Sequence, residues 1–309
     1  MSILITGGAG FQGSHLAERL IHEGHHVTIL GTDSERAEKN IAAIGGPVTW
    51  IRGSITDQEI VEKTVRNCDT VIHLAAHIHV DESIKNPRAT VEVNVMGTLN
   101  VLEAARKYGK RLIHGSSCEV YGAMKEGDAS MDETYELRPF SPYAASKAAV
   151  DRLCFAYVKT YDMDIAIVRP FNVFGERQKD GPGGALIPIL VSRALEGEPL
   201  TIYGDGEQKR DYIYISDLID AYVLVLRTPN LKGQVINFGT GSATSIKDIA
   251  TYIGKKLNAP IIHGPARPGE VSNFVANIEK AKHLGFSPKI SIWEGIDRYI
   301  AWKTQTDAV

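Results

Sequence analysis

A tyrosine and a lysine four positions apart are well suited to proton transfer. Tyr143 and Lys147 form Y-x-x-x-K within SPYAASKAAVDRL, and residues at i and i+4 share one face of a helix. A nearby ammonium favours the phenolate, so such a tyrosine acts as a base below its ordinary pKa of about 10. Ser116 and Ser117 end an apolar run that reads as a strand. This set suits hydride transfer at a carbinol: Tyr143 takes the hydroxyl proton, Ser117 orients it, and Lys147 tunes the tyrosine.

A glycine triplet near the start of the chain predicts a dinucleotide site. Gly7, Gly10 and Gly13 form G-x-x-G-x-x-G directly after an apolar strand and at the beginning of a helix. Glycine permits the tight turn and the close approach of the backbone to a pyrophosphate, which then faces the helix N-terminus.

Two features bear on which dinucleotide is bound. An acidic residue about 20 positions after the glycines is expected to bind the adenosine ribose, and Asp33 has that spacing. However, the residue directly after the strand at 27–30 is Gly31, and Arg36 nearby could meet a 2′-phosphate. We therefore expect NAD, with NADP as the alternative.

The first half of the chain must supply the elements that position these residues. Apolar runs predict buried strands at 3–6, 27–30, 48–52, 70–74, 111–116 and 165–169. Helical patterns lie between them at 13–23, 57–67, 90–107 and 143–161. This alternation predicts an α/β fold: a Rossmann-type, doubly wound parallel sheet with right-handed crossovers and helices on both faces.

After Pro170 the composition changes, because glycine and proline concentrate in GERQKDGPGG and GPARPGE. Helical patterns recur further on, and 235–238 reads as one more strand. We expect a dinucleotide-binding domain at 1–170 and a smaller, partly interleaved α/β substrate domain at 171–309. Strand 235–238 and the helix that follows it are expected to return to the first domain.

Six motifs occur in order along the chain: TGGAGFQG, HLAA, Y-x-x-x-K, RPFNVFG, YGDGEQKRDYIYISD and RPGE. Together they resemble the NAD-dependent epimerase/dehydratase family, which are extended short-chain dehydrogenase/reductases acting on nucleotide-sugars. The resemblance runs from Ile3 to the region of Trp302. It implies a Rossmann domain of about seven strands, a nucleotide-sugar-binding domain, and NAD(P) recycled within one active site.

The resemblance also implies site residues. Beyond the glycines, Tyr143 and Lys147, the implied cofactor contacts are Phe11, Gln12, Asp33, Ser54, Ile55, Leu74, Ala75, Ala76, Asn94 and Pro170. The implied substrate contacts are His79, Asn172, Gln208, Arg210, Arg267 and Glu270. Arginine suits this task because its fork matches phosphate oxygens. Gln12 replaces the isoleucine usual in this motif, and Ser54 stands where the family often has an aspartate for the adenine amine.

The motif SSCEVYG, residues 116–122, bears on the reaction. A glutamate at the position of Glu119 resembles the dehydratases and the UDP-glucuronate decarboxylases. The pair Cys118-Glu119 resembles the UDP-N-acetylglucosamine 5,6-dehydratase of tunicamycin biosynthesis. The chemistry agrees, because a C4 ketone acidifies the C5 hydrogen, which a carboxylate at Glu119 could remove. A thiol is neutral at pH 7, so Cys118 could protonate the departing C6 hydroxyl. A 4,6- or 5,6-dehydratase of a nucleoside-diphosphate hexose is therefore expected.

Other reactions remain open. A UDP-sugar 4-epimerase needs only Ser117, Tyr143, Lys147 and rotation of the 4-keto sugar; Cys118 would then fill space and Glu119 would brace the site. A UDP-glucuronate decarboxylase is a further alternative, although the motif carries no extra arginine. A non-enzymatic NAD(P) sensor typically lacks the catalytic tyrosine or lysine, and this chain keeps both.

Composition restricts the class of protein. Hydrophobic residues make up 43%, charged residues 23%, and the net charge is −3, so no basic excess indicates nucleic acid or an anionic membrane. No apolar run is long enough for a membrane span, and MSILITGG does not read as a signal peptide. Three cysteines without framework spacing favour the cytoplasm.

We expect no metal site, because no carboxylate or cysteine completes a metal-binding pattern with His73, His77 and His79. The family resemblance suggests a homodimer built from the helices around 97–108 and 143–161.

Overall fold

The computed structural model describes residues 1–181, 183–266 and 273–307. The chain forms two compact units and passes between them repeatedly. The first unit comprises Met1–Val120, Leu137–Arg169 and Ile219–Ile236. The second comprises Tyr121–Glu136, Pro170–Leu218 and Asn237–Val309.

A seven-stranded sheet is the centre of the first unit. Its order is β11-β6-β5-β4-β1-β2-β3, and every pair from β3 to β6 is parallel. The chain runs outward from β1 to β3 and then returns to the other side of β1 with β4, which gives a doubly wound sheet. The predicted fold class is therefore confirmed. The strands are β1 (Ser2–Thr6), β2 (His26–Gly31), β3 (Thr49–Arg52), β4 (Thr70–His73), β5 (Arg111–Gly115), β6 (Ile165–Pro170) and β11 (Val235–Phe238).

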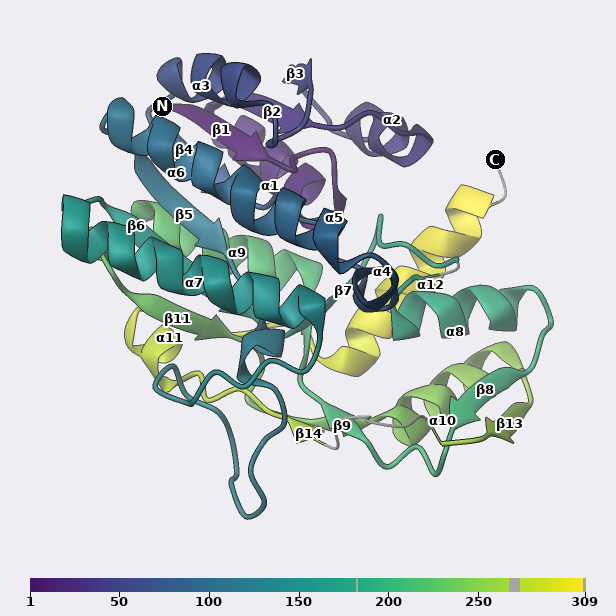
Figure 1. The fold of residues 1–309 in the computed structure, drawn as a ribbon. Helices are drawn as coiled ribbons and strands as arrows, with labels where there is room; N and C mark the ends of the chain where they lie inside the picture. The colour runs from purple at the N-terminus through teal and green to yellow at the C-terminus, as the bar shows by residue number, and fades with distance from the viewer. Residues whose placement is uncertain (182, 267–272, 308–309) are drawn as a thin grey trace. The chain divides into compact units, whose positions relative to one another are not determined.

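Helices cover both faces of this sheet. Figure 1 shows α3, α6 and α7 on the near face, with α1 and α9 behind it. The helices that follow strands of this sheet are α1 (Phe11–His22), α2 (Glu35–Ala42), α3 (Gln58–Arg66), α4 (Val80–Lys85), α5 (Pro87–Val91), α6 (Gly97–Lys107) and α7 (Pro142–Tyr161), whereas α9 (Ile215–Arg227) precedes β11. Strand residues Leu4, Val71 and Leu112 are fully buried in one apolar core with Val101 and Leu102 of α6. Burial on both faces explains why these strands are continuous apolar runs.

The predicted helix at 90–107 is interrupted in the structure. α5 continues into a π-helical turn, Glu92–Met96, before α6 begins at Gly97. Such a turn widens the backbone locally and is frequent at functional sites. It carries Asn94, which is 1% exposed.

Among the residues that the structure describes, the second unit is built from short strands and four helices, with the start of α9 in addition. Its elements, apart from the start of α9, are β7 (Asn172–Phe174), α8 (Leu186–Leu195), β8 (Leu200–Tyr203), β9 (Lys209–Arg210), β10 (Tyr212–Tyr214), β12 (Thr244–Ser245), α10 (Ile246–Leu257), β13 (Ile261–Gly264), β14 (Asn273–Phe274), α11 (Glu279–His283) and α12 (Ile292–Asp307). The buried carboxylate of Asp211 ties its loops together. It accepts hydrogen bonds from the backbone of Thr240, Gly241 and Ala276 at 2.7, 2.9 and 3.2 Å.

A single domain boundary at residue 170 is too simple, because each of the two units contains segments from before and after that residue. Strand β11 joins the first sheet, but α10, which follows it, belongs to the second unit, contrary to expectation. The helix that accompanies the sheet is most of α9. It is held there because the Arg111 guanidinium donates to the carbonyls of Val225, Leu226 and Thr228 at its C-terminal end. The segment Tyr121–Glu136 lies in the second unit.

Candidate active site

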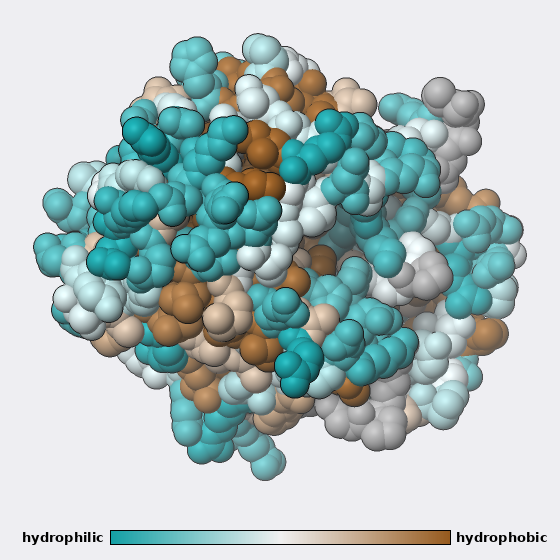
Figure 2. Space-filling view, turned by 45° about the horizontal axis from the view of Figure 1, so that its top comes forward, coloured by the Kyte–Doolittle hydropathy of each residue, from teal (hydrophilic) through white to brown (hydrophobic). Residues whose placement is uncertain are grey.

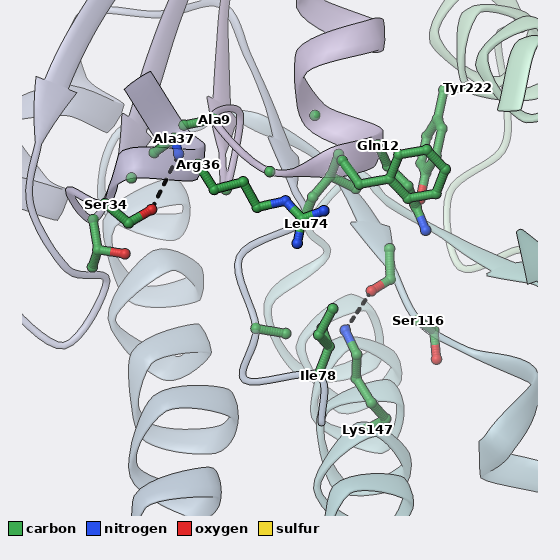
Figure 3. A pocket seen from close by; sticks show the side chains of 18 of the residues that line it. Ala9, Gln12, Ser34, Arg36, Ala37, Leu74, Ile78, Ser116, Lys147 and Tyr222 are labelled. Atoms are coloured by element: carbon green, nitrogen blue, oxygen red, sulfur yellow. Dashed lines mark hydrogen bonds between the residues drawn. The ribbon is translucent and has the colours of Figure 1, made fainter. Parts of the chain in front are cut away.

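A cavity of about 300 Å³ opens at the carboxyl ends of the strands of the first unit. This edge, next to the point where the strand order reverses, is where ligands bind in open α/β sheets. The cavity is lined from turns after β1, β2, β4 and β5 and from helices α1, α2, α7 and α9 (Figure 3). The lining residues are Gly7, Ala9, Gly10, Phe11, Gln12, Gly13, Gly31, Thr32, Ser34, Arg36, Ala37, Leu74, Ala76, Ile78, Gly115, Ser116, Tyr143, Lys147 and Tyr222.

The glycine turn forms one wall of the cavity, and its geometry excludes side chains. Gly7 has φ +71°, and a Cβ placed there would lie 2.7 Å from the backbone nitrogen of Ala75. A Cβ on Gly13 would lie 2.4 Å from the carbonyl oxygen of Gly7. Gly10 precedes the first residue of α1, so the free amides of that helix end beside the cavity. This cradle fits a pyrophosphate-bearing dinucleotide.

The end of the cavity beyond β2 differs from the predicted acidic site. Asp33 does not line the cavity; its carboxylate is 3.3 Å from the Arg52 guanidinium and is 58% exposed. Thr32, Ser34 and Arg36 line the cavity instead. Ser34 also caps the N-terminus of α2, because its hydroxyl accepts a hydrogen bond from the Ala37 amide at 3.1 Å. This end of the cavity therefore carries hydroxyls and a guanidinium.

Several other expected cofactor residues lie outside the cavity lining. The Ser54 hydroxyl is 2.8 Å from that of Thr56. Ile55 is buried against Gly97, where a Cβ would meet its side chain at 2.7 Å. The backbone of Ala75 lies directly against Gly7 of the glycine turn. These residues shape the surroundings of the cavity.

Asn94 also acts as a support in this structure. Its side-chain oxygen accepts the His77 amide at 2.6 Å. Its amide nitrogen donates to the His77 carbonyl at 3.0 Å and to the Ser146 hydroxyl at 2.8 Å. Asn94 thus joins the loop after β4 to α7, the helix that carries Tyr143.

The start of α7 is fixed by its own sequence. Ser141 caps the helix by accepting the Ala144 amide at 3.1 Å, and Pro142 occupies the first turn, where no amide is needed. The Tyr143 amide donates to the Ser83 hydroxyl of α4 at 3.1 Å. One turn later, the Lys147 ammonium donates to the Gly115 carbonyl at 2.8 Å. Burial lowers the pKa of Lys147 to about 8.

Four candidate catalytic side chains influence one another at the end of β5. Burial raises the pKa of Tyr143, a hydrogen bond with Ser117 opposes this, and the nearby Glu119 and Cys118 raise it further. The direction is opposite to that expected from the lysine alone, because burial dominates and Lys147 is bonded to a carbonyl. Ser117 also accepts the Glu119 amide at 3.2 Å. The structure therefore brings Ser117, Cys118, Glu119 and Tyr143 together.

Ser116 has a different partner. Its hydroxyl donates to the carboxylate of Asp151 at 2.8 Å. Asp151 forms a buried, two-point ion pair with Arg169 at 2.8 and 2.9 Å. Burial raises the pKa of Asp151, but Arg169 and its other partners hold it below its usual value. Of the two adjacent serines, Ser116 therefore belongs to the buried ion-pair network, and Ser117 hydrogen-bonds Tyr143.

Comparison with known proteins identifies the family. A family model described as "NAD dependent epimerase/dehydratase family" matches residues 3–239. The chain belongs to this family. It is 34% identical to a UDP-N-acetyl-alpha-D-glucosaminuronate decarboxylase of Bacillus cytotoxicus, covering 97% of this chain and 96% of the relative. It is also 34% identical to a dTDP-glucose 4,6-dehydratase of Streptomyces niveus, covering 98% and 92%.

Solved structures agree with this assignment. The UDP-glucose 4-epimerase of Thermus thermophilus, determined in complex with NAD, superimposes with a TM-score of 0.88 and 33% identity. That match covers 98% of both chains. The family thus establishes the chain as an NAD-dependent nucleotide-sugar enzyme, and its relatives carry out three reactions: dehydration, 4-epimerisation and decarboxylation.

The substrate contacts implied by the family fall in both units. His79 precedes α4 in the first unit. In the second unit, the Asn172 amide donates to the Asp211 carbonyl at 3.1 Å, and Gln208 donates to the Tyr203 carbonyl at 3.4 Å. The Arg210 guanidinium lies 5.2 Å from the centre of the Phe274 ring. Pro170 ends β6, and Arg267 and Glu270 lie outside the described residues.

Some lining residues were not predicted from the sequence. Tyr222 lies in the middle of α9, within a run that shows only the apolar pattern of a buried helix. Ile78 and Ala37 come from segments without a family motif. Among the described residues, no group of histidine, cysteine, aspartate or glutamate is arranged to hold a metal ion. The described helices include none with the length and apolar character of a membrane span.

Proposed function

We propose that this family member is a dehydratase of a nucleoside-diphosphate hexose. The observation that carries the proposal is the proximity of Glu119 and Cys118 to Tyr143 at the end of β5. A carboxylate and a thiol beside the catalytic tyrosine supply the base and the acid that elimination of water requires. Cys118 is 4% exposed, so its thiol is shielded from bulk solvent.

The first step is oxidation of the sugar at C4. Tyr143 removes the proton of the C4 hydroxyl while Ser117 hydrogen-bonds the same oxygen. A nicotinamide cofactor bound in the cavity would supply the acceptor for the C4 hydride and the source from which the sugar regains it. Burial raises the pKa of Tyr143 in the protein alone, which favours its neutral form before ligands bind. Lys147, donating to the Gly115 carbonyl, holds a positive charge one helical turn away.

The second step is elimination of water. The C4 ketone acidifies the C5 hydrogen, and Glu119 removes it as a proton. The C5–C6 double bond forms as the C6–oxygen bond breaks, and Cys118 supplies the proton that converts the departing hydroxyl into water. A hydride supplied to C6, with a proton to C5, would give a 4-keto-6-deoxy sugar. A hydride supplied to C4, with the proton returned by Tyr143 to the C4 oxygen, would give the 5,6-unsaturated sugar.

The 4-epimerase is the second candidate, and the Ser117–Tyr143 hydrogen bond is the observation that favours it. Epimerisation needs only this pair, Lys147 and rotation of the keto sugar. Glu119 and Cys118 would then have no proton to transfer. The two candidates consequently differ in what happens at C5.

The deciding experiment supplies the enzyme with a panel of UDP-, GDP- and dTDP-hexoses in deuterated water. A dehydratase gives a product lighter by one water, with solvent deuterium at C5 or with no hydrogen there. An epimerase leaves the mass unchanged and the original C5 hydrogen in place. Loss of carbon dioxide from a hexuronic acid nucleotide would identify a decarboxylase. A product of unchanged mass that retains its C5 hydrogen contradicts the dehydratase proposal.

We further propose NAD as the cofactor, with NADP as a second ligand of the same cavity. The relative solved with NAD and the glycine cradle support this assignment.

We also propose a cytoplasmic homodimer. All three cysteines, Cys68, Cys118 and Cys154, are buried and form no disulfide, which suits a reducing compartment. Neither a nucleic acid nor a membrane is part of the proposal.

A further inference from the structure

Tyr222 is a buried polar residue that neither the motifs nor the proposed reaction uses. It is 0% exposed, lies on α9 and lines the cavity. Its hydroxyl has no hydrogen-bond partner among the residues that the structure describes. A buried hydroxyl without a partner is unfavourable, so its place in the wall of a cavity points to a ligand that supplies the partner.

The position of the hydroxyl restricts which part of the ligand it meets. A Cβ placed on Gly115 would lie 2.8 Å from the Tyr222 oxygen, so the hydroxyl rests against the end of β5. Lys147 donates to the carbonyl of this same glycine. Burial and then the nearby Tyr143 raise the pKa of Tyr222, so its hydroxyl remains a donor at neutral pH. The hydroxyl therefore faces the catalytic half of the cavity.

Gln12 adds a second polar group to the same wall. It lies in the first turn of α1 and lines the cavity. Figure 3 shows Gln12, Tyr222 and Ser116 on one side of the cavity and Ser34 on the other. With the pyrophosphate at the glycine turn and the adenosine beside Ser34, this side receives the nicotinamide.

We propose that Tyr222 and Gln12 bind the carboxamide of the nicotinamide ring. The carboxamide has one acceptor oxygen and a donor NH2 group. The Tyr222 hydroxyl donates to the oxygen, and the side-chain oxygen of Gln12 accepts from the NH2 group. Because the carboxamide is attached to the ring, these bonds determine which face of the ring is presented to the sugar. The inference rests on the dinucleotide binding assigned under the proposed function.

The test compares two ligands by titration calorimetry in the absence of sugar. NAD contains the nicotinamide, whereas ADP-ribose contains the same pyrophosphate and both riboses without it. Tyr222→Phe is expected to weaken NAD binding about fivefold to tenfold, which is the loss of one hydrogen bond, and to leave ADP-ribose binding unchanged. Gln12→Leu is expected to show the same selectivity. Tyr299→Phe removes a buried hydroxyl outside the cavity lining and should affect neither ligand.

Thermal unfolding provides an independent readout. Phenylalanine at 222 removes no hydrogen bond within the described protein, so the Tm of the ligand-free variant should equal that of the wild type or exceed it. A lower Tm would show a structural hydroxyl and overturn the inference. Equal weakening of both ligands, or no weakening of either, would also overturn it. If the wild type binds neither ligand, the proposed function itself fails.

Discussion

Glu119 is the side chain that separates dehydration from epimerisation. Glu119→Gln keeps the size and the hydrogen-bonding capacity but removes the base. If Glu119 takes the C5 proton, oxidation at C4 still occurs and elimination stalls, with turnover lower by about 10²- to 10⁴-fold. Stopped-flow absorbance in the near ultraviolet should then show reduced nicotinamide accumulating on the enzyme.

Tyr143→Phe is the matched comparison for this experiment. It removes the acceptor for the C4 hydroxyl proton, so oxidation itself should slow and no reduced nicotinamide should accumulate. A Glu119→Gln variant that keeps nearly full turnover would contradict the role of Glu119 in proton transfer. The epimerase would then become the better explanation of the site.

Arg36 is the residue expected to bind the 2′-phosphate that distinguishes NADP from NAD. It lines the end of the cavity that we propose holds the adenosine, whereas the Asp33 carboxylate is paired with Arg52. A guanidinium that meets a 2′-phosphate contributes one charge-assisted interaction, so Arg36→Ala should weaken NADP binding about tenfold and change NAD binding little. Equilibrium titration with both dinucleotides measures the ratio of the two affinities.

Lys39 provides the control for this prediction. It lies on the same helix, pairs with Glu35 at 2.8 Å and does not line the cavity. Lys39→Ala should leave both affinities unchanged. If Arg36→Ala weakens NAD binding as much as NADP binding, the guanidinium contacts a group present in both dinucleotides, and the predicted contact with the 2′-phosphate is wrong.

Strands β4 and β5 place two buried histidines face to face. His73 and His114 are paired in register, and their ring centres are 5.5 Å apart. His73 is bonded to Thr6 and Thr98, but neither ring nitrogen of His114 has a partner among the described residues. His114→Leu should therefore raise the free energy of unfolding by about 1–3 kcal/mol, measured by urea denaturation.

The gain from His114→Leu should depend on pH. Burial lowers the pKa of His114 well below its usual value and that of His73 to about 3. Below a pH of about 6.5 the unfolded chain binds protons that the folded chain refuses, so the wild type loses stability as the pH falls. The variant should lose less between pH 7 and pH 5. The exposed His283, changed to leucine, serves as the control; an equal gain there would argue against the buried ring as the cause.

Predictability from the sequence varied with the kind of element. The strands of the large sheet are fully buried apolar runs, and the predicted bounds differ from β1, β4 and β5 by one residue at an end. The π-helical turn at 92–96 is not predicted, because its residues keep the pattern of an ordinary helix. Strands such as β8 and β13 contain four residues each and depend on partners distant in sequence, so no local signal marks them.

The same distinction holds for the site. The glycine turn, Tyr143 and Lys147 were found because each is tied to a local motif, and all line one cavity. Asp33 was expected from spacing alone, but its partner Arg52 comes from another strand. Tyr222 was missed because its place depends on how α9 packs behind the sheet.

At the scale of the whole molecule, the helices α5 to α7 present apolar side chains to the surface. Val91, Met96, Phe155 and Tyr161 are 45%, 51%, 39% and 49% exposed. Figure 2 shows apolar patches among hydrophilic side chains on the side that carries α6 and α7 in Figure 1. Such patches mark protein interfaces, and the proposed homodimer would cover this one.

Charged substitutions on this surface should dissociate the dimer. Met96→Glu combined with Phe155→Glu places like charges opposite each other across a two-fold interface. Sedimentation velocity should show the wild type at twice the mass of one chain and the variant at the mass of one. Leu195→Glu, on α8 of the second unit, is the matched control for an exposed apolar residue and should stay dimeric. A monomeric wild type would contradict the proposal.

The repeated passage of the chain between the two units has a consequence for biosynthesis. Strand β11, one of the two edge strands of the large sheet, is translated more than 60 residues after its neighbour β6. Until residue 238 leaves the ribosome, the nascent sheet ends at β6, and the backbone groups on the side of β6 away from β5 have no strand to pair with. An open edge of this kind recruits other chains. Fragments that end near residue 170 should therefore aggregate, and chaperone binding should be strongest while residues 171–234 are being made. Strand β11 therefore completes the large sheet only after residues 171–218 of the second unit have been translated.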